Sequence, residues 1–429
     1  MFGFANFLLL ALFAAAVFDL IFALARGGGL RGALHGLWNT PHLLFGQQLA
    51  EWRLQLGRIL FAAGLAAYEI SVVFCNSMAR QNWAWVQGVM SPVLEWLAFL
   101  CFGAKILFGT RYTWRELLAG GALYFIARWV YFNSQNIWWI GIVVAVLAAK
   151  DVPLRRPLQV YFASGCAAMA VVLALHFAGI VAPDLTSERM GALRGTYGYG
   201  HPNTFGGLVF GLVLAYALLR AQKVRWVDCL LVFAVGVFLL VGPASRSAAL
   251  CTLALAVGLV FCRLRAGHSV PRWWPGTCAG MVGLTAAVSY LLPLLVIKVG
   301  PWNNDIGPAW LAKLDSLLTC RISLTWMAYR LLDVKIAGQV FNWPTVDNSF
   351  AFALFQFGPV VAALLGILFA VALWGHAKQG RRVEVCCLFA MLAYAYMEVQ
   401  PFHLTTNPTA LLLCGAVFAQ TSARWQRIE

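Results

Sequence analysis

Apolar segments long enough to cross a bilayer recur along this chain from its first residues to its C-terminal end. The hydrocarbon core of a bilayer is about 30 Å thick, and a helix that crosses it needs about 20 apolar residues. Of the 429 residues, 62% are hydrophobic and 11% are charged, whereas roughly 25% are charged in soluble domains. A secretory signal would explain only the first segment. The strands of a membrane barrel would alternate apolar and polar residues, which these continuous runs do not. The sequence therefore predicts an all-α, polytopic membrane protein.

We expect about 13 transmembrane helices, within a range of 12–14, in one integral membrane domain that spans residues 1–429. The fifth of these segments is short, and the fourth and fifth are the least regular of the set. The expected segments are 3–25, 58–78, 86–108, 116–133, 136–149, 158–182, 202–219, 227–243, 247–262, 276–297, 349–374, 384–399 and 403–420.

Lysine and arginine are distributed unevenly between the loops that these segments create. If the N-terminus lies outside and the C-terminus inside, the inner loops hold 21 of the 31 basic residues and the outer side holds nine. Arg128 lies within a segment. Because cytoplasmic loops are enriched in lysine and arginine, we expect residues 183–201 to form an outer loop and 263–273 an inner one. The net charge of +15 then reflects topology and contact with anionic lipids rather than with nucleic acid.

The longest predicted outer segment is the loop 298–348, which carries five basic residues. Its stretch 311–333, "LAKLDSLLTCRISLTWMAYRLLD", has apolar residues at helical spacing. We expect it to form one amphipathic helix that lies on the outer membrane face.

The 11 cysteines are scattered, and many of them lie inside apolar runs. Their spacing matches neither a metal site nor a disulfide framework. We interpret them as small buried apolar residues. No P-loop or dinucleotide-binding glycine motif is present, so we expect neither a metal nor a cofactor.

The stretch 194–207, "RGTYGYGHPNTFGG", joins an outer loop to a predicted helix that Pro202 opens. A helix N-terminus attracts anions, glycines allow close approach of a ligand, and Arg194 could bind a phosphate through two nitrogen atoms. These features indicate a phosphate or pyrophosphate site that includes His201 and Asn203. The alternative is a flexible loop that a proline caps.

Two further outer turns carry charged residues at the membrane boundary. In "GPASRSAAL", residues 242–250, Arg246 lies almost within the apolar phase. A charge at such depth is often functional, although the side chain could instead snorkel to the interface. In "VDNSFAFALFQFG", residues 346–358, Asp347 could act as a general base or could cap the helix that follows, and Asn348 lies beside it.

The last outer turn, within "EVQPFHLTTNPTALL", contains Glu398, His403 and Asn407. Glu398 and His403 are further candidates for accepting a proton. Taken alone, His403 is more typical of an interface histidine than of a catalyst.

In order and spacing, these stretches resemble motifs of the Wzy-type polysaccharide polymerases and the related O-antigen ligases, and the similar part covers about residues 155–420. "GHPNTFG" is similar to the family's His-Pro-Asn motif, and "SRSAAL" to its Ser-Arg-Ser/Gly turn. "LLTCRISLTWMAY" resembles the arginine-bearing segment of the large outer loop. The His-Pro-Asn version is most like polymerases of Gram-positive capsule and exopolysaccharide systems. Val346 and Asp347 stand where the ligases carry a functional histidine, which favours a polymerase.

The resemblance implies a GT-C-like glycosyltransferase of the bacterial cytoplasmic membrane, with its active site facing outside. Such enzymes polymerise oligosaccharide repeat units that are linked to polyprenyl pyrophosphate. The implied protein partners are a flippase and a chain-length regulator. By this resemblance, Asp347, Glu398 or His403 would accept the acceptor proton. The residues expected to bind the substrate and its pyrophosphate are Arg194, His201, Asn203, Arg246, Arg321 and Asn348.

Two alternative functions remain open at this stage. One is ligase-like transfer of a glycan to another acceptor. The other is a polysaccharide flippase or a proton-coupled transporter, which would use intramembrane charges as relays. Asp19, Glu69, Glu95 and Arg128 are such charges, although no internal repeat of the kind found in transporters is visible.

Overall fold

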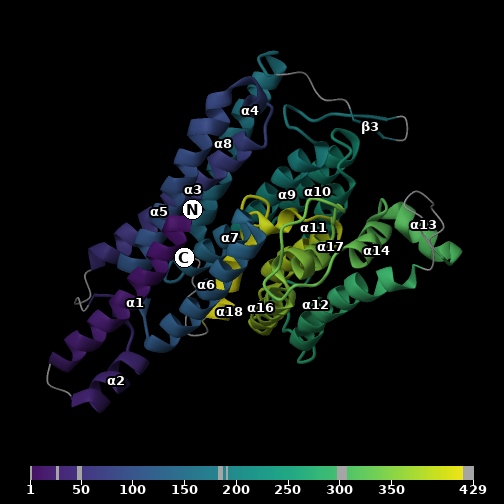
Figure 1. Ribbon diagram of the computed structural model, residues 1–429. Helices are drawn as coiled ribbons and strands as arrows, with labels where there is room; N and C mark the ends of the chain where they lie inside the picture. The colour runs from purple at the N-terminus through teal and green to yellow at the C-terminus, as the bar shows by residue number, and fades with distance from the viewer. Residues whose placement is uncertain are drawn as a thin grey trace. The chain divides into compact units, whose positions relative to one another are not determined.

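The computed structural model describes residues 2–25, 29–45, 51–181, 187–189, 192–296 and 307–418, most of which lie in helices (Figure 1). Parts of the predicted loops 183–201 and 298–348 and of the last predicted segment lie outside these residues. Contacts divide the chain into two units. Unit 1 comprises residues 1–128, 139–208 and 410–429, and unit 2 comprises 129–138 and 209–409.

The prediction of a mostly helical protein is confirmed, and several of its helices are candidates for membrane spans. Among the described residues, strands occur only as two short antiparallel pairs, β1 (His42–Leu43) with β2 (Arg111–Tyr112) and β3 (Ser187–Arg189) with β4 (Ala192–Arg194). Eight described helices are long and apolar enough to cross a membrane. They are Gly3–Ala25, Glu51–Cys75, Val86–Phe108, Arg155–Phe177, Pro202–Leu219, Arg246–Leu264, Trp274–Leu295 and Pro359–Lys378.

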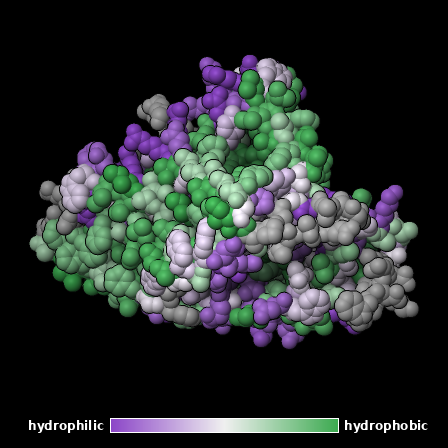
Figure 2. All heavy atoms as spheres, turned by 90° about the horizontal axis from the view of Figure 1, so that it is seen from above, coloured by the Kyte–Doolittle hydropathy of each residue, from purple (hydrophilic) through white to green (hydrophobic). Residues whose placement is uncertain are grey.

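Large apolar side chains are exposed along these helices, as a lipid environment requires. Phe13 is 70% exposed and Val257 is 69% exposed. On the face drawn in Figure 2, apolar side chains cover much of the surface and hydrophilic ones form separate patches.

Unit 1 is built around α3, which packs against α5 and α8 (Figure 1). Gly64 permits this packing, because a Cβ atom there would lie 2.8 Å from Cε1 of Phe102. The helices that lie wholly or partly in this unit are α1 (Phe2–Ala25), α2 (Gly29–Asn39), α3 (Glu51–Cys75), α4 (Ala79–Asn82), η1 (Val86–Met90), α5 (Ser91–Phe108), α6 (Trp114–Ser134), α7 (Ile137–Ala148), α8 (Arg155–Phe177), α9 (Pro202–Leu219), η5 (Pro408–Leu413) and α18 (Cys414–Val417).

The basic loops of unit 1 meet at one end of its helices. β1 pairs with β2, and Arg115 Nη2 donates to Asn39 Oδ1 at 3.0 Å. Lys150 Nζ donates to the carbonyl oxygen of Arg111 at 2.7 Å. Three loops that the charge pattern placed on the inner side therefore contact one another.

The opposite end of unit 1 brings together loops that were placed on the outer side. The N–H of Met78 donates to the Gly198 carbonyl oxygen at 2.8 Å, and Asn82 Nδ2 donates to the Ile180 carbonyl oxygen at 3.3 Å. Within this unit, the contacts agree with the alternation of loops that the sequence predicts.

In unit 2, α10 packs against α11, α11 against α17, and α12 against α16 (Figure 1). At one end of these helices, Arg382 donates to the carbonyl oxygens of Arg265 and His268, so two predicted inner loops again meet. The described elements that lie wholly in this unit are α10 (Trp226–Val241), α11 (Arg246–Leu264), α12 (Trp274–Leu291), η2 (Leu292–Leu295), α13 (Ala309–Leu317), α14 (Arg321–Leu331), α15 (Ser349–Phe352), η3 (Ala353–Phe357), α16 (Pro359–Lys378), α17 (Arg382–Met397) and η4 (Gln400–Phe402).

The prediction of one amphipathic helix over 311–333 is wrong. Thr319 and Cys320 have φ values of 58° and 64°, a left-handed conformation that ends α13 before α14 begins. Buried Asp315 stabilises the break, because its carboxylate accepts hydrogen bonds from the N–H groups of Ile322 at 2.7 Å and Ser323 at 3.2 Å. A side chain of α13 thus caps the N-terminus of α14.

The predicted segment 349–374 is also not one helix. Gly358, with φ of 88°, separates η3 from α16. A Cβ atom on Gly358 would lie 2.1 Å from the carbonyl oxygen of Ile336, so any larger residue at this position would clash with the backbone. Pro359 then opens α16, since its missing N–H costs nothing at a helix start.

The predicted segment 403–420 begins later than expected. Residues 403–407 form a turn, and Pro408–Val417 is a short apolar helix that starts in the 3₁₀ form. Conversely, α2 lies in a region where the sequence predicted only a loop.

Candidate functional site

The His-Pro-Asn stretch of unit 1 folds back on Arg194. Arg194 ends β4 and is buried, and its Nη2 donates to Asn203 Oδ1 at 2.9 Å. Pro202 is the first residue of α9, as predicted. The Asn203 N–H donates to Nδ1 of exposed His201 at 3.1 Å, and the Thr204 N–H donates to the His201 carbonyl oxygen at 3.0 Å. The first N–H groups of this helix are therefore bonded within the loop.

In unit 2, the guanidinium of Arg321 is buried at the first residue of α14 and uses all five of its N–H donors. Nε donates to the carbonyl oxygen of Met397, and Nη1 donates to the carbonyl oxygen of Leu318 at 2.9 Å and to the Thr319 hydroxyl. Nη2 donates to Ser247 Oγ at 3.3 Å and to Glu398 Oε1 at 2.6 Å. A pyrophosphate could bind Arg321 only by displacing one of these acceptors.

Glu398 joins three of the segments that the sequence singled out. It lies in the turn just beyond α17 and forms a buried ion pair with Arg321. The Ser247 hydroxyl, in the first turn of α11, donates to Glu398 Oε1 at 2.9 Å. The Ser349 hydroxyl, at the start of α15, donates to the Glu398 carbonyl oxygen at 2.6 Å. The turn 242–250, helix α14, the stretch 346–358 and the last outer turn therefore converge at one end of unit 2.

The Glu398 carboxylate is held by its partners, although its pKa is raised. Burial is the largest cause of the upward shift and the negative charge of Asp347 adds to it, while Arg321 and the Ser247 hydroxyl lower the pKa by less. Because Glu398 is the counter-charge of Arg321, taking up a proton there would leave a buried cation without a partner.

Asp347 and Asn348 have different roles in the fold. Asn348 is the N-cap of α15, since its Oδ1 accepts from the N–H groups of Phe350 at 2.9 Å and Ala351 at 3.1 Å. Its Nδ2 donates to Ser289 Oγ at 3.1 Å. The interpretation of Asp347 as the cap is therefore wrong. Among the described residues, the half-buried Asp347 carboxylate makes no hydrogen bond or ion pair, yet it lies close enough to Glu398 to act on its charge.

His403 is held against an aromatic ring. The centroids of the His403 and Trp138 rings are 3.8 Å apart. Loss of hydration lowers the pKa of His403 to about 3, so the ring is neutral at physiological pH. A group of such low basicity is a poor general base near pH 7, because the best catalytic pKa lies near the working pH.

Arg246 is exposed at the first residue of α11, immediately before Ser247. That Arg246 and Arg321 share one cavity with Arg194 stays a prediction. The sequence drew attention to the arginine of "SRS", but the structure shows that the serine after it makes the buried contact. Serine hydroxyls are common at helix starts, so sequence alone gave no signal for Ser247 or Ser349.

Within the described part of the chain, no group of three or more histidine, cysteine or acidic residues is arranged to hold a metal ion. Positive charge near the cluster comes from arginines. No protein-family model, curated protein or solved structure matches this chain.

Proposed function

We propose that this protein polymerises oligosaccharide repeat units linked to polyprenyl pyrophosphate at the outer face of the bacterial cytoplasmic membrane. The observation that carries the proposal is the cluster of Arg321, Glu398, Ser247 and Asp347. It joins the motif-bearing segments of unit 2 at the end opposite the basic loops. Ionisable groups whose pKa is shifted by burial and by a specific charge partner, as at Glu398, cluster at functional sites.

The proposed reaction transfers a glycan from one lipid to another. A hydroxyl oxygen of the acceptor repeat unit attacks the anomeric carbon of the donor. A new glycosidic C–O bond forms, and the C–O bond to the lipid pyrophosphate breaks. The pyrophosphate leaves with the bonding electrons, and the hydroxyl proton passes to a base.

Asp347 is the proposed general base, because its carboxylate makes no hydrogen bond or ion pair among the described residues. Glu398 is ion-paired with Arg321, and loss of hydration lowers the pKa of His403 to about 3. Arg246 is exposed and could meet the charge that develops on the leaving pyrophosphate. Arg321 and Glu398 act as positioning residues that hold the outer ends of α11, α14 and α17 around this carboxylate.

The direct test is incubation of the purified protein, in liposomes, with lipid-linked repeat units. A polymerase produces a ladder of lipid-linked oligomers from these substrates alone. A ligase-like enzyme would need a second acceptor and, without one, would leave the lipid-linked units at their original length. A transporter would move single units across the bilayer without changing their length, which would contradict the proposal.

A further inference from the structure

A groove opens at the basic end of unit 1, between the start of α3 and the end of α5. Its volume is ≈ 580 Å³, within the range of about 300–1,000 Å³ that ligand sites have. Its walls are mostly apolar and include Trp52, Leu56, Leu60 and Phe108, and Arg53 is the charged residue that lines it. We refer to it as the α3–α5 groove.

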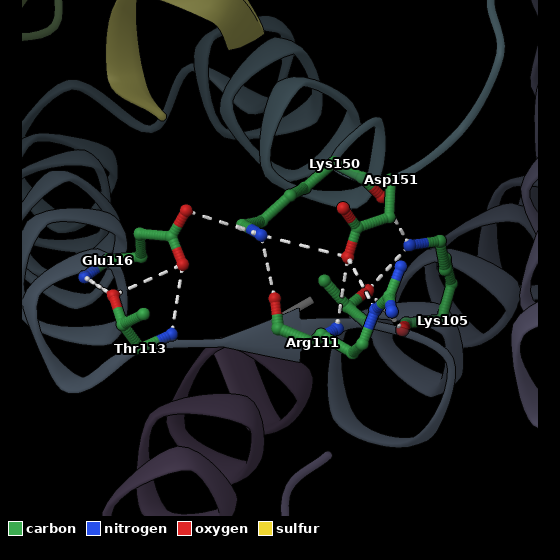
Figure 3. A network of polar contacts seen from close by, with 7 residues as sticks. Lys105, Arg111, Thr113, Glu116, Lys150 and Asp151 are labelled. Carbon is green, nitrogen blue, oxygen red and sulfur yellow. Dashed lines mark hydrogen bonds and ion pairs between the residues drawn. The ribbon is translucent and has the colours of Figure 1, made fainter. Parts of the chain in front are cut away.

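Two glycines form the floor of the α3–α5 groove. A Cβ atom on Gly57 would lie 2.8 Å from the carbonyl oxygen of Gly109, so the two backbones touch. The Lys105 side chain runs against the same point, with Cδ 3.0 Å from that Cβ position. Behind the floor, Lys105 Nζ donates to Thr110 Oγ1 at 2.5 Å and to the Lys150 carbonyl oxygen at 2.6 Å (Figure 3). The hydrogen bonds of Lys105 point away from the groove, into this buried network.

The groove has an amphipathic gradient along α3. Arg53 lies in the first turn of the helix, and its Nε donates to the Phe108 carbonyl oxygen at 2.9 Å, which fixes the guanidinium at the groove wall. Leu60 lies seven residues further on, about 10 Å deeper at 1.5 Å per residue. Trp52, 64% exposed, stands at the mouth, as tryptophan does at a membrane interface.

Basic residues outnumber acidic ones around the mouth. Arg58 is exposed on the same helix, Arg111 lies in β2, and Arg115 lies in the first turn of α6, shortly after Gly109. Exposed Glu51 begins α3, whereas Glu116 and Asp151 both pair with Lys150. An apolar groove that ends in arginines at headgroup depth is complementary to a lipid with an anionic headgroup.

We propose that the α3–α5 groove binds one anionic glycerophospholipid of the leaflet at this end of unit 1. Its phosphate contacts Arg53, and the first part of an acyl chain lies along Leu56, Leu60 and Phe108. The site serves to anchor the N-terminal helices and is independent of the proposed transferase reaction.

Lipid retention measured by native mass spectrometry tests this site directly. The intact protein is exchanged into detergent with phosphatidylglycerol or phosphatidylcholine, and bound lipids are counted as detergent is removed. Wild type should retain one phosphatidylglycerol in preference to phosphatidylcholine. Arg53→Gln keeps an N–H donor for Phe108 but removes the charge, so the preference should fall roughly fivefold, the value of one basic residue at a membrane surface.

Two further variants separate the parts of the site. Leu60→Trp fills the deep end of the groove and should reduce retention of both lipids. Arg58→Gln removes a charge from the same helix without touching the groove, so it should change the preference less than Arg53→Gln. Equal effects of Arg53→Gln and Arg58→Gln, or unchanged retention in Leu60→Trp, would overturn the proposal. If Arg53→Gln does not fold, the Leu60→Trp result decides alone.

Discussion

Among the described residues, both units contain a cluster of buried charges where loops meet at a helix end, and the two clusters are balanced in different ways. In unit 1, Lys150 lies between Glu116 at 3.3 Å and Asp151 at 3.6 Å (Figure 3). Each carboxylate also accepts a backbone N–H, from Thr113 at 2.9 Å for Glu116 and from Arg111 at 3.2 Å for Asp151. Every acidic group of this network is bound.

In the cluster of unit 2, Arg321 pairs with Glu398, whereas the nearby Asp347 carboxylate makes no ion pair among the described residues. A closed network rigidifies the loops that it joins, whereas a carboxylate without a partner next to a buried ion pair is available for chemistry. The difference suggests that the basic end of unit 1 is structural and that this end of unit 2 is functional.

Matched replacement of one aspartate in each cluster should give the largest contrast. Asp347→Asn keeps the shape of the side chain but cannot accept a proton, and loss of a general base costs about 10²- to 10⁴-fold in rate. The ladder assay on purified protein measures this effect. The melting temperature of the Asp347→Asn variant should equal that of wild type, because the Asp347 carboxylate makes no hydrogen bond among the described residues.

Asp151→Asn is the control for this experiment. It weakens the contact to Lys150 and should lower the free energy of unfolding by about 1.5–3 kcal/mol, as for a hydrogen bond to a charged group. Its polymerisation rate per folded molecule should not change. Wild-type polymer from Asp347→Asn at equal expression would reject the base role and make Glu398 the next candidate.

Among these variants, removal of one partner of the Arg321–Glu398 pair should cause the largest loss in the free energy of unfolding. Glu398→Gln leaves a buried guanidinium without its counter-charge, which typically costs about 3–5 kcal/mol. Glu116→Gln in unit 1 should cost less, since Asp151 still faces Lys150. Denaturant unfolding in detergent compares the two variants, and equal losses would show that the clusters are balanced alike.

The cap of α15 gives a smaller effect. Asn348→Ala removes the acceptor for two N–H groups and should destabilise by about 1–2 kcal/mol. Asn348→Asp keeps a capping oxygen and should recover most of this loss, although the donor to Ser289 is missing. If Asn348→Ala abolished polymerisation without lowering the melting temperature, Asn348 would instead contact substrate, as the sequence predicted.

The sequence predicted the helices better than the details of the site. Continuous apolar runs predicted most of the long helices, and Pro202 predicted the first residue of α9 correctly. The breaks at Cys320 and Gly358 were missed because they depend on contacts with Asp315 and Ile336. The periodicity of apolar residues carries no information about such contacts.

At the candidate site, charged residues in outer turns identified Arg321, Glu398 and Asp347 as candidates. The pairing of Arg321 with Glu398 was not predicted, since 77 positions separate them and no local pattern links them. The role of Asp347 was open for a similar reason, since it could act as a base or as a helix cap, and Asn348 was predicted to bind substrate. Only the hydrogen bonds at the start of α15 show that Asn348 is the cap.

The smallest predicted effect concerns pH and the ion pair between His42 and Asp19 in unit 1, where Nε2 lies 3.3 Å from Oδ2. Nδ1 of His42 contacts the Thr40 carbonyl oxygen at 3.1 Å, so both ring nitrogens face acceptors and the protonated form is favoured. Burial lowers the pKa of His42, but the hydrogen bonds to Asp19 and Thr40 raise it more, and the net shift is upward from 6.5.

A raised histidine pKa contributes stability that is fully present below pH 6.5 and is lost as the pH rises through the folded-state value. The melting temperature of wild type should therefore fall between about pH 6 and pH 8, by the equivalent of up to about 1 kcal/mol for a partly exposed pair. His42→Gln removes the titrating group, so its melting temperature should lose this pH-dependent component. The difference between the two melting curves isolates His42 from other titrating groups, and a difference that did not vary with pH would show that His42 is not charged in the folded protein.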